Sequence, residues 1–159
     1  MIDKSQKWIF NERKMKIELQ RLNEAYHFQA VNEDGATLDM DAAPQIGGLN
    51  LGFRPMQVLL AGLGGCSSID VISILKKQKQ PLEDIRVSIN GERDKDQVPS
   101  LFTEIHVHFT LAGELDEDKV KKAIDLSMDK YCSVAKTLEK TAKITHSYQI
   151  VREMTSVQG

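Results

Sequence analysis

Two cysteines, Cys66 and Cys132, are the residues of this sequence with the most specific chemistry. In a reducing compartment a permanent structural disulfide is not expected, so the pair consists either of two buried, inert thiols or of a redox couple. In a redox couple one thiol attacks an oxidant and becomes a sulfenic acid, with which the second thiol condenses to a disulfide. Spacing along the chain does not show whether the two side chains meet, so both interpretations stay open at this point.

The segment before Cys66 is unusually rich in glycine for a helix. Gly62, Gly64 and Gly65 lie within an otherwise apolar stretch, and each costs about 1 kcal/mol relative to alanine in a helix interior. Small residues in a buried helix let another backbone or a substrate approach closely. The alternative is tight helix packing around a cysteine that acts as a small hydrophobic side chain. Cys132 lies on the apolar side of a second predicted helix and, taken alone, is typical of a core residue.

A reactive thiol also needs a lowered pKa, which a nearby cation can provide. The sequence does not choose among the arginines that could do so, which are Arg13, Arg21, Arg54, Arg86 and Arg93. Within the charged run from Glu92 to Asp96, which is typical of a solvated loop, only Arg93 is carried forward as a candidate activating residue.

His106 and His108 are two residues apart on a predicted strand, on the same face as Glu104. They could chelate a metal, but no further ligand stands at a diagnostic spacing, and the alternation with apolar residues favours the solvated face of a sheet. His27 and His146 are isolated and are expected to be structural. The sequence contains no Gly-x-Ser-x-Gly, no phosphate-binding glycine loop and no Cys-x-x-Cys. We therefore expect no metal and no organic cofactor.

The hydrophobic pattern predicts an α+β protein with antiparallel sheets and two long helices. Period-2 alternation indicates strands and period 3.6 indicates helices. In chain order the expected elements are strands over 13–21, 26–31 and up to Met40, a helix over 56–79, strands around 85–89 and 105–111, a helix from the N-cap Asp116 to about Ala142, and a strand over 144–150. The first helix is apolar on nearly every face and is expected to be buried all round. We expect an N-terminal arm over 1–12, a single domain over 13–152 and a tail over 153–159.

Composition excludes several classes of function. The formal net charge of −2 gives no long-range attraction to nucleic acid or to anionic lipid. The longest apolar stretch, Val58 to Cys66, is far shorter than the ~20 residues that cross a bilayer. The first residues, Met1 to Ser5, do not resemble a signal peptide, so we expect a cytoplasmic protein that binds neither nucleic acid nor membrane.

The segments that carry both cysteines resemble the OsmC-like (OsmC/Ohr) family, and in particular its YhfA-like branch. The resemblance covers about residues 13–151. Its segments are Pro55 to Ala61 continuing into Gly64-Gly65-Cys66, Ile69-Asp70-Val71, Ser73-Ile74-Leu75, Lys130 to Ala135, Leu138-Glu139-Lys140, Leu101-Phe102-Thr103 and Ile144 to Tyr148.

This resemblance implies a βββ-α-ββ-α-β fold and an intertwined homodimer with the cysteine-bearing helices at its centre. It further implies reduction of organic hydroperoxides, with Cys66 as the peroxidatic and Cys132 as the resolving cysteine. In characterised members an Arg and a Glu hold the peroxidatic thiolate. Here Gln57 stands at the position of that Glu (or Met56, if the register differs by one), and Arg93 is the candidate for the Arg.

Three functional hypotheses follow. The first is a thiol-dependent peroxidase whose Cys66–Cys132 disulfide is reduced by an external dithiol, such as a lipoyl protein or thioredoxin. The alternatives are a non-catalytic binder of a small hydrophobic ligand and a thiol redox sensor of the same fold. A cation in contact with Cys66 would favour the enzyme or the sensor, whereas a wholly apolar surrounding would favour the binder.

Overall fold

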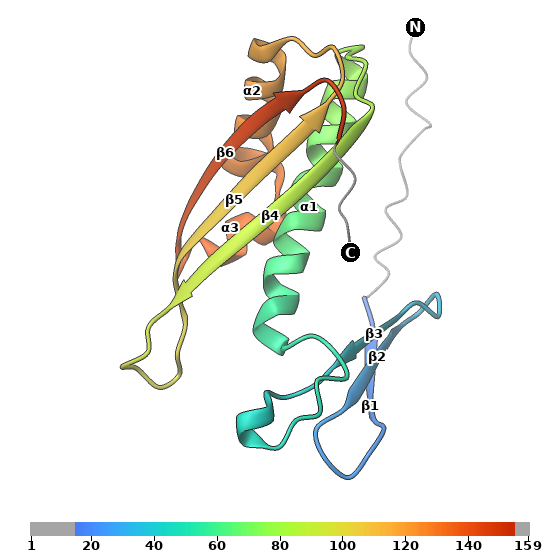
Figure 1. The fold of residues 1–159 in the computed structure, drawn as a ribbon, viewed down its shortest axis with the longest axis vertical. Coiled ribbons are helices and arrows are strands. Elements are labelled where there is room, and N and C mark those ends of the chain that lie inside the picture. Colours follow the sequence, from blue (N-terminus) through green and yellow to red (C-terminus); the bar gives the residue numbers. More distant parts are fainter. Residues whose placement is uncertain (1–14, 155–159) are drawn as a thin grey trace, which may run out of the picture. The chain divides into compact units, whose positions relative to one another are not determined.

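The computed structural model describes residues 15–154 (Figure 1). The chain divides into two compact units, Met1–Pro55 and Met56–Gly159. The expected arm over 1–12 and residues 155–159 of the expected tail lie outside the described residues. The assignment of 13–152 to a single domain stays a prediction.

The three strands expected in the N-terminal part of the chain form an antiparallel meander in the first unit. Its strands are β1 (Ile17–Arg21), β2 (Phe28–Asn32) and β3 (Thr37–Met40), in the spatial order β1-β2-β3. The β2–β3 turn forms at Asp34-Gly35. Gly35 has φ of +85°, and its N–H donates to the carbonyl of Asn32, a left-handed conformation that glycine adopts without strain. A short 3₁₀ helix, Pro44–Ile46, follows in the loop.

The buried carboxylate of Asp41 organises the loop after β3. Its oxygens accept backbone N–H groups from Ala42 (2.7 Å), Leu49 (2.9 Å) and Leu51 (3.1 Å), and the residue is only 2% exposed. The hydrogen bond from Leu51, supported by those from Leu49 and Ala42, lowers the pKa of Asp41. Arg54 closes the same loop by donating to the carbonyl oxygens of Asp41 and Gly52.

This first unit has almost no hydrophobic core of its own. In its described part, 15–55, Ala30 is the one buried hydrophobic residue, while Ile17 and Leu19 on β1 are each 57% exposed. A three-stranded sheet needs a covered apolar face to be stable. The unit therefore has apolar surface to place against another element.

The second unit packs three helices on one face of a three-stranded sheet (Figure 1). Its elements are α1 (Pro55–Lys77), β4 (Asp84–Arg93), β5 (Phe102–Ala112), α2 (Glu117–Leu126), the π-helical segment η2 (Ser127–Tyr131), α3 (Ser133–Leu138) and β6 (Lys143–Val151). The predicted α+β class and order of elements are confirmed. The predicted cap of α2 is confirmed as well, because Asp116 accepts the N–H of Lys119 at 2.9 Å.

The expectation of purely antiparallel sheets is wrong for the second sheet. In the order β4-β5-β6, β4 pairs antiparallel with β5, but β5 pairs parallel with β6, with Phe109 opposite Tyr148. The chain leaves β5, crosses one face of the sheet through α2, η2 and α3, and re-enters beside the start of β5. A long crossover of this kind is what parallel neighbours require.

The expected second long helix is also wrong, because it is interrupted at Cys132. Cys132 has φ −68° and ψ 103°, an extended conformation between η2 and α3. Its Sγ accepts the N–H of Ala135 at 3.4 Å and so caps α3. π-Helical segments inside helices often mark functional sites.

The core lies between the helices and the sheet. The central strand β5 supplies a regular series of fully buried side chains, as expected for a strand with neighbours on both edges. The buried hydrophobic residues that form this core are Leu63, Val71, Leu75, Phe102, Ile105, Val107, Phe109, Leu111, Val120, Ala123, Ile124, Met128, Cys132, Ala135 and Ala142.

Helix α1 is buried on one side only, which corrects the expectation that it is buried all round. Leu63, Ser67 and Val71 face the core, whereas Ile69 is 66% exposed. By length and composition alone α1 could cross a bilayer, a test that core helices of soluble proteins also pass.

Candidate functional site

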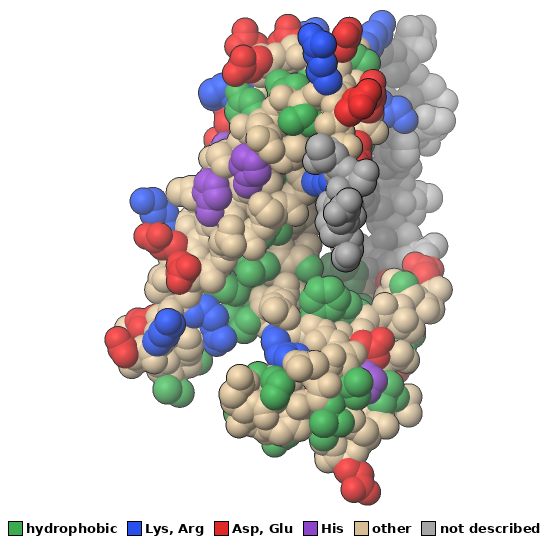
Figure 2. Space-filling view, viewed as in Figure 1, with side chains coloured by type: hydrophobic (Ala, Val, Ile, Leu, Met, Phe, Trp, Pro, Cys, Tyr) green, Lys and Arg blue, Asp and Glu red, His purple; other side chains and the backbone are tan. Residues whose placement is uncertain are grey.

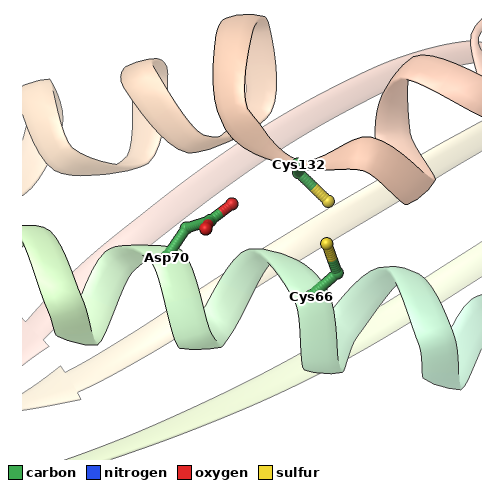
Figure 3. Close-up of side chains that lie close together, drawn as sticks. All are labelled: Cys66, Asp70 and Cys132. Carbon is green, nitrogen blue, oxygen red and sulfur yellow. The ribbon is translucent and has the colours of Figure 1, made fainter. Parts of the chain in front are cut away.

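The two cysteines and one carboxylate meet at the contact between α1 and the joint of η2 with α3 (Figure 3). The Sγ atoms of Cys66 and Cys132 and a carboxylate oxygen of Asp70 all lie within 4.8 Å of one another. The two sulfurs point toward each other (Figure 3). Spatial adjacency of the thiols, which spacing along the chain left open, is therefore a property of the fold.

Local structure explains why these side chains converge. Cys66 and Asp70 are four residues apart on α1, so they share one face of the helix. Cys132 comes from the opposite side, at the non-helical residue between two helical segments. Because this residue caps α3 through its own sulfur, the same backbone geometry that starts α3 also directs the thiol toward α1.

Two buried serines hold the segments together at this point. Ser127 donates from its Oγ to the carbonyl of Ser67 on α1 at 3.2 Å, and also lies 3.3 Å from Oδ2 of Asp70. The Oγ of Ser67 donates back to the carbonyl of Leu63 at 2.8 Å. Both serines are fully buried, so these hydrogen bonds fix the distance between α1 and η2 and orient the carboxylate of Asp70.

The two thiols differ in their environment. Cys132 is fully buried, and burial raises the pKa of its thiol to about 11; the neighbouring Cys66 sulfur adds to this, and the N–H of Ala135 opposes it. Cys132 is therefore a neutral thiol at neutral pH. Cys66 is only half-buried, so an external molecule reaches Cys66 before it reaches Cys132.

Of the arginines named from the sequence, Arg21, Arg54 and Arg93 donate to nearby backbone carbonyls, whereas Arg86 lies 3.8 Å from the carboxylate of Asp84. Arg93 lies at a β-bulge near the end of β4 and donates from Nε and Nη2 to the carbonyl of Ser100, at 3.0 and 2.7 Å. Arg21 binds the carbonyls of Ala25 and Glu24. Arg13 lies outside the described residues. The role of Arg93 as the activating arginine stays a prediction.

Gln57 is exposed in the first turn of α1. The structure places it on the same helix as Cys66, more than two turns before the cysteine. Its role as the residue at the family's Glu position also stays a prediction.

The histidines hydrogen-bond to other polar groups. On the face of the second sheet away from the helices, His106 and His108 both lie 2.8 Å from Ser147 Oγ, and Figure 2 shows His side chains together on this face. His27 pairs with Asp39 at 2.7 Å, and His146 with Asp125 at 3.1 Å. Among the described residues, 15–154, the group of potential metal ligands consists of Cys66, Asp70 and Cys132. It differs from the group considered from the sequence, which was Glu104, His106 and His108.

Asp70 is the site residue that sequence reasoning missed. A carboxylate one helical turn after Cys66 is visible in the sequence. Its proximity to Cys132 depends on the packing of α1 against η2, which no local pattern encodes. Ser127 was missed for the same reason.

Comparison with known proteins agrees with this architecture. A family model described as OsmC-like protein matches residues 48–147, well over half of the chain. The chain belongs to the OsmC-like family. Protein YhfA of Escherichia coli K12 is 49% identical to it over 98 residues, which cover 61% of this chain and 72% of that protein.

Solved structures show the same fold. A hypothetical protein from Aquifex aeolicus has a TM-score of 0.75 at 29% identity and covers 88% of this chain and 98% of its own. The OsmC-like protein of Mycoplasma pneumoniae has a TM-score of 0.75 at 22% identity, covering 89% and 99%. The organic hydroperoxide resistance protein OhrB of Bacillus subtilis has a TM-score of 0.61 at 18% identity, covering 85% and 97%.

Proposed function

We propose that this protein is a thiol-dependent peroxidase that reduces organic hydroperoxides and contributes to oxidative-stress defence. The observation that carries the proposal is the convergence of Cys66 and Cys132, whose sulfurs face each other within 4.8 Å. Membership of the OsmC-like family supports it. So does the structural similarity to proteins whose names refer to organic hydroperoxide resistance.

The difference in burial assigns the two roles. Cys66, the more accessible thiol, attacks the distal oxygen of the hydroperoxide as thiolate, and the O–O bond breaks. The leaving alkoxide takes up the proton that the thiol released and departs as an alcohol, and Cys66 becomes a sulfenic acid. The thiol of Cys132 then attacks the sulfenic sulfur, forming the S–S bond and releasing water. An external dithiol, such as a lipoyl protein or thioredoxin, returns both cysteines to thiols by exchange.

Asp70 supports the second step. The raised pKa of Cys132 means that its proton must be removed as the S–S bond forms. The carboxylate of Asp70 lies within 4.8 Å of both sulfurs, so it can accept this proton and pass it to the departing hydroxide. Ser127 holds the carboxylate in place during the transfer.

The disulfide requires the sulfurs to approach from as much as 4.8 Å to the ~2.05 Å of an S–S bond. Cys132 lies in an extended residue between two helical segments. Rotation there breaks fewer helical hydrogen bonds than rotation within α1 would, so we assign most of this movement to the η2–α3 joint.

We further propose that the protein acts as a homodimer. An exposed stripe runs along α1 at helical spacing and consists of Leu59, Gly62, Gly65, Ile69 and Ile72. Glycines at the centre of an apolar stripe let a second helix approach closely, and soluble proteins rarely leave such a patch uncovered. The first unit's meander, with Ile17 and Leu19 exposed, offers further apolar surface. A second copy of the chain could bury both the stripe of α1 and the exposed side chains of the meander.

The cytoplasm is the compartment that we propose for this reaction, because its reducing poise keeps the dithiol available. A redox sensor would use the same two thiols and form the same disulfide, but it would not turn over. Catalytic turnover therefore separates the two functions.

The test is consumption of cumene hydroperoxide by the full chain with dihydrolipoamide as reductant. The wild type should turn over many equivalents, and Cys66→Ser should turn over none. Cys132→Ser should lose turnover coupled to the dithiol. The matched control is Ser133→Ala, an exposed neighbour of Cys132, which should retain the wild-type rate. If the wild-type protein stops after it has consumed one equivalent of hydroperoxide, it is a redox sensor. If it consumes no hydroperoxide, it is neither a peroxidase nor a sensor.

A further inference from the structure

We propose that Cys66, Asp70 and Cys132, when both thiols are reduced, form a binding site for a thiophilic divalent cation of the Zn²⁺ type. This inference goes beyond peroxidase activity and does not depend on it. Binding needs only the three side chains in their reduced positions. It therefore applies equally if the protein does not consume hydroperoxides.

The donor set fits this class of ion. Two sulfurs and one carboxylate oxygen, all within 4.8 Å of one another, resemble the ligands of catalytic zinc sites, in which three protein groups leave a fourth position open. With Zn–S near ~2.3 Å and Zn–O near ~2.0–2.2 Å, tetrahedral ligand atoms lie roughly 3.5–3.8 Å apart. The ligand atoms therefore need to approach one another by at most about 1 Å. Thiolate ligands also select against Mg²⁺ and Ca²⁺, which prefer oxygen.

The surroundings hold the ligands in place. Ser127 contacts Oδ2 of Asp70 at 3.3 Å, and the N–H of Ala135 donates to Sγ of Cys132 at 3.4 Å. Hydrogen bonds of this kind orient metal ligands and stabilise thiolate charge. Cys66 and Asp70 come from adjacent turns of one helix, so two of the three ligands are already positioned by α1.

Burial leaves one side of the site accessible. Cys132 is fully buried, whereas Cys66 and Asp70 are half-buried. In the single chain a cation can therefore enter past Cys66 and Asp70, and water can occupy the fourth position. This is also the side from which a hydroperoxide would reach Cys66.

One consequence distinguishes this site from a simple surface chelate. The disulfide form has no thiolate to offer, so oxidation must release the cation. Conversely, a bound cation occupies the lone pairs with which Cys66 would attack an oxidant. Metal and oxidant therefore exclude each other at this site.

The experiment uses Co²⁺ as a probe with the reduced, metal-free full chain. The expected result is one Co²⁺ per chain, with a thiolate-to-cobalt charge-transfer band in the near ultraviolet and the intense visible bands of a tetrahedral complex. Zn²⁺ should displace it. Asp70→Asn should weaken binding by about tenfold or more, whereas Asp129→Asn, an exposed carboxylate on η2, should not change it. Thermal denaturation of each variant confirms folding.

The oxidation state of the two thiols provides a second test of the site. Wild-type protein oxidised to the disulfide should show no charge-transfer band, and reduction should restore it. Zn²⁺ at the concentration that half-saturates the wild type should slow alkylation of the wild-type thiols clearly and those of Asp70→Asn much less. The proposal is overturned if reduced protein gives no thiolate charge-transfer band at saturating Co²⁺, or if folded Asp70→Asn binds as tightly as wild type. A protein that binds Co²⁺ in this way yet consumes no hydroperoxide would refute the peroxidase while leaving the metal site intact.

Discussion

Neighbouring glycines on α1 provide a quantitative test of the proposed dimer. A Cβ at Gly64 would lie 2.5 Å from Cδ1 of Ile89 on β4, inside the core of the second unit. Within the described part of the chain, a Cβ at Gly65 or Gly62 meets nothing within 4 Å. Gly64 therefore serves packing within one chain, whereas Gly65 and Gly62 lie in the exposed stripe of α1.

The magnitudes follow from this difference. Replacing glycine by alanine in a helix interior stabilises the folded state by about 1 kcal/mol through helix propensity. Overpacking a well-packed contact destabilises it by about 1–3 kcal/mol. Gly64→Ala should therefore change the free energy of unfolding by between zero and a loss of roughly 2 kcal/mol. If the stripe of α1 were solvated, Gly65→Ala would stabilise the protein by about 1 kcal/mol. If a second copy packs on the stripe of α1, the added methyl group overpacks the dimer interface instead. The same cost then raises the dimer dissociation constant by roughly 5- to 150-fold.

The assay is sedimentation velocity across a concentration series, with thermal denaturation at two protein concentrations. We expect a wild-type dimer whose Tm rises with concentration, and weaker dimers for Gly65→Ala and Gly62→Ala. Gly64→Ala should leave Tm unchanged or lower it, without selectively weakening the dimer. A wild-type monomer at micromolar concentration, together with a Gly65→Ala variant of higher Tm, would refute the reasoning.

Three further predictions concern single residues. Gln57→Glu should raise the rate of hydroperoxide consumption under one reductant, because a carboxylate orients an activating guanidinium more firmly than an amide does; an equal or slower rate would show that Gln57 is not the missing partner. Cys132→Ser treated with one equivalent of hydroperoxide should accumulate Cys66 as sulfenic acid, detectable with dimedone, and excess oxidant should drive it to sulfinic acid. The lowered pKa of Asp41 stabilises the fold at pH above the pKa of the unfolded residue, ~3.9, and this contribution is lost as pH falls through the folded value. Asp41→Asn should therefore lower Tm at pH 7, with a difference from wild type that shrinks in acid; a constant difference from pH 7 to pH 3 would contradict this.

The regular elements were predictable because their patterns are local. Alternation in β5 and the apolar run of α1 place both elements within a few residues of their observed bounds. The parallel pairing of β6 was not predictable from pattern, since a half-buried strand has the same period in either orientation. The break at Cys132 was missed because the apolar stripe of α2 continues through η2 and α3, so hydrophobic periodicity does not register the change of backbone geometry.

The candidate site was predictable only in part. The cysteines were identified from residue type and from family resemblance, and the structure brings them together. Asp70 and Ser127 join them through a contact between segments about sixty residues apart, which depends on tertiary packing. The structure also brings a carboxylate, Asp70, close to both sulfurs, and the activating arginine expected from the sequence stays a prediction.

The central claim is that Cys66 and Cys132 form one redox couple within one chain. The most direct measurement is intact-mass and peptide analysis of the reduced wild type after one equivalent of cumene hydroperoxide. We predict a chain lighter by two hydrogens, free of reactive thiols, whose Cys66 and Cys132 peptides are joined by an intramolecular disulfide. Two thiols that survive excess hydroperoxide unchanged, or a Cys66 that proceeds to sulfinic acid while Cys132 stays reduced, would contradict the account.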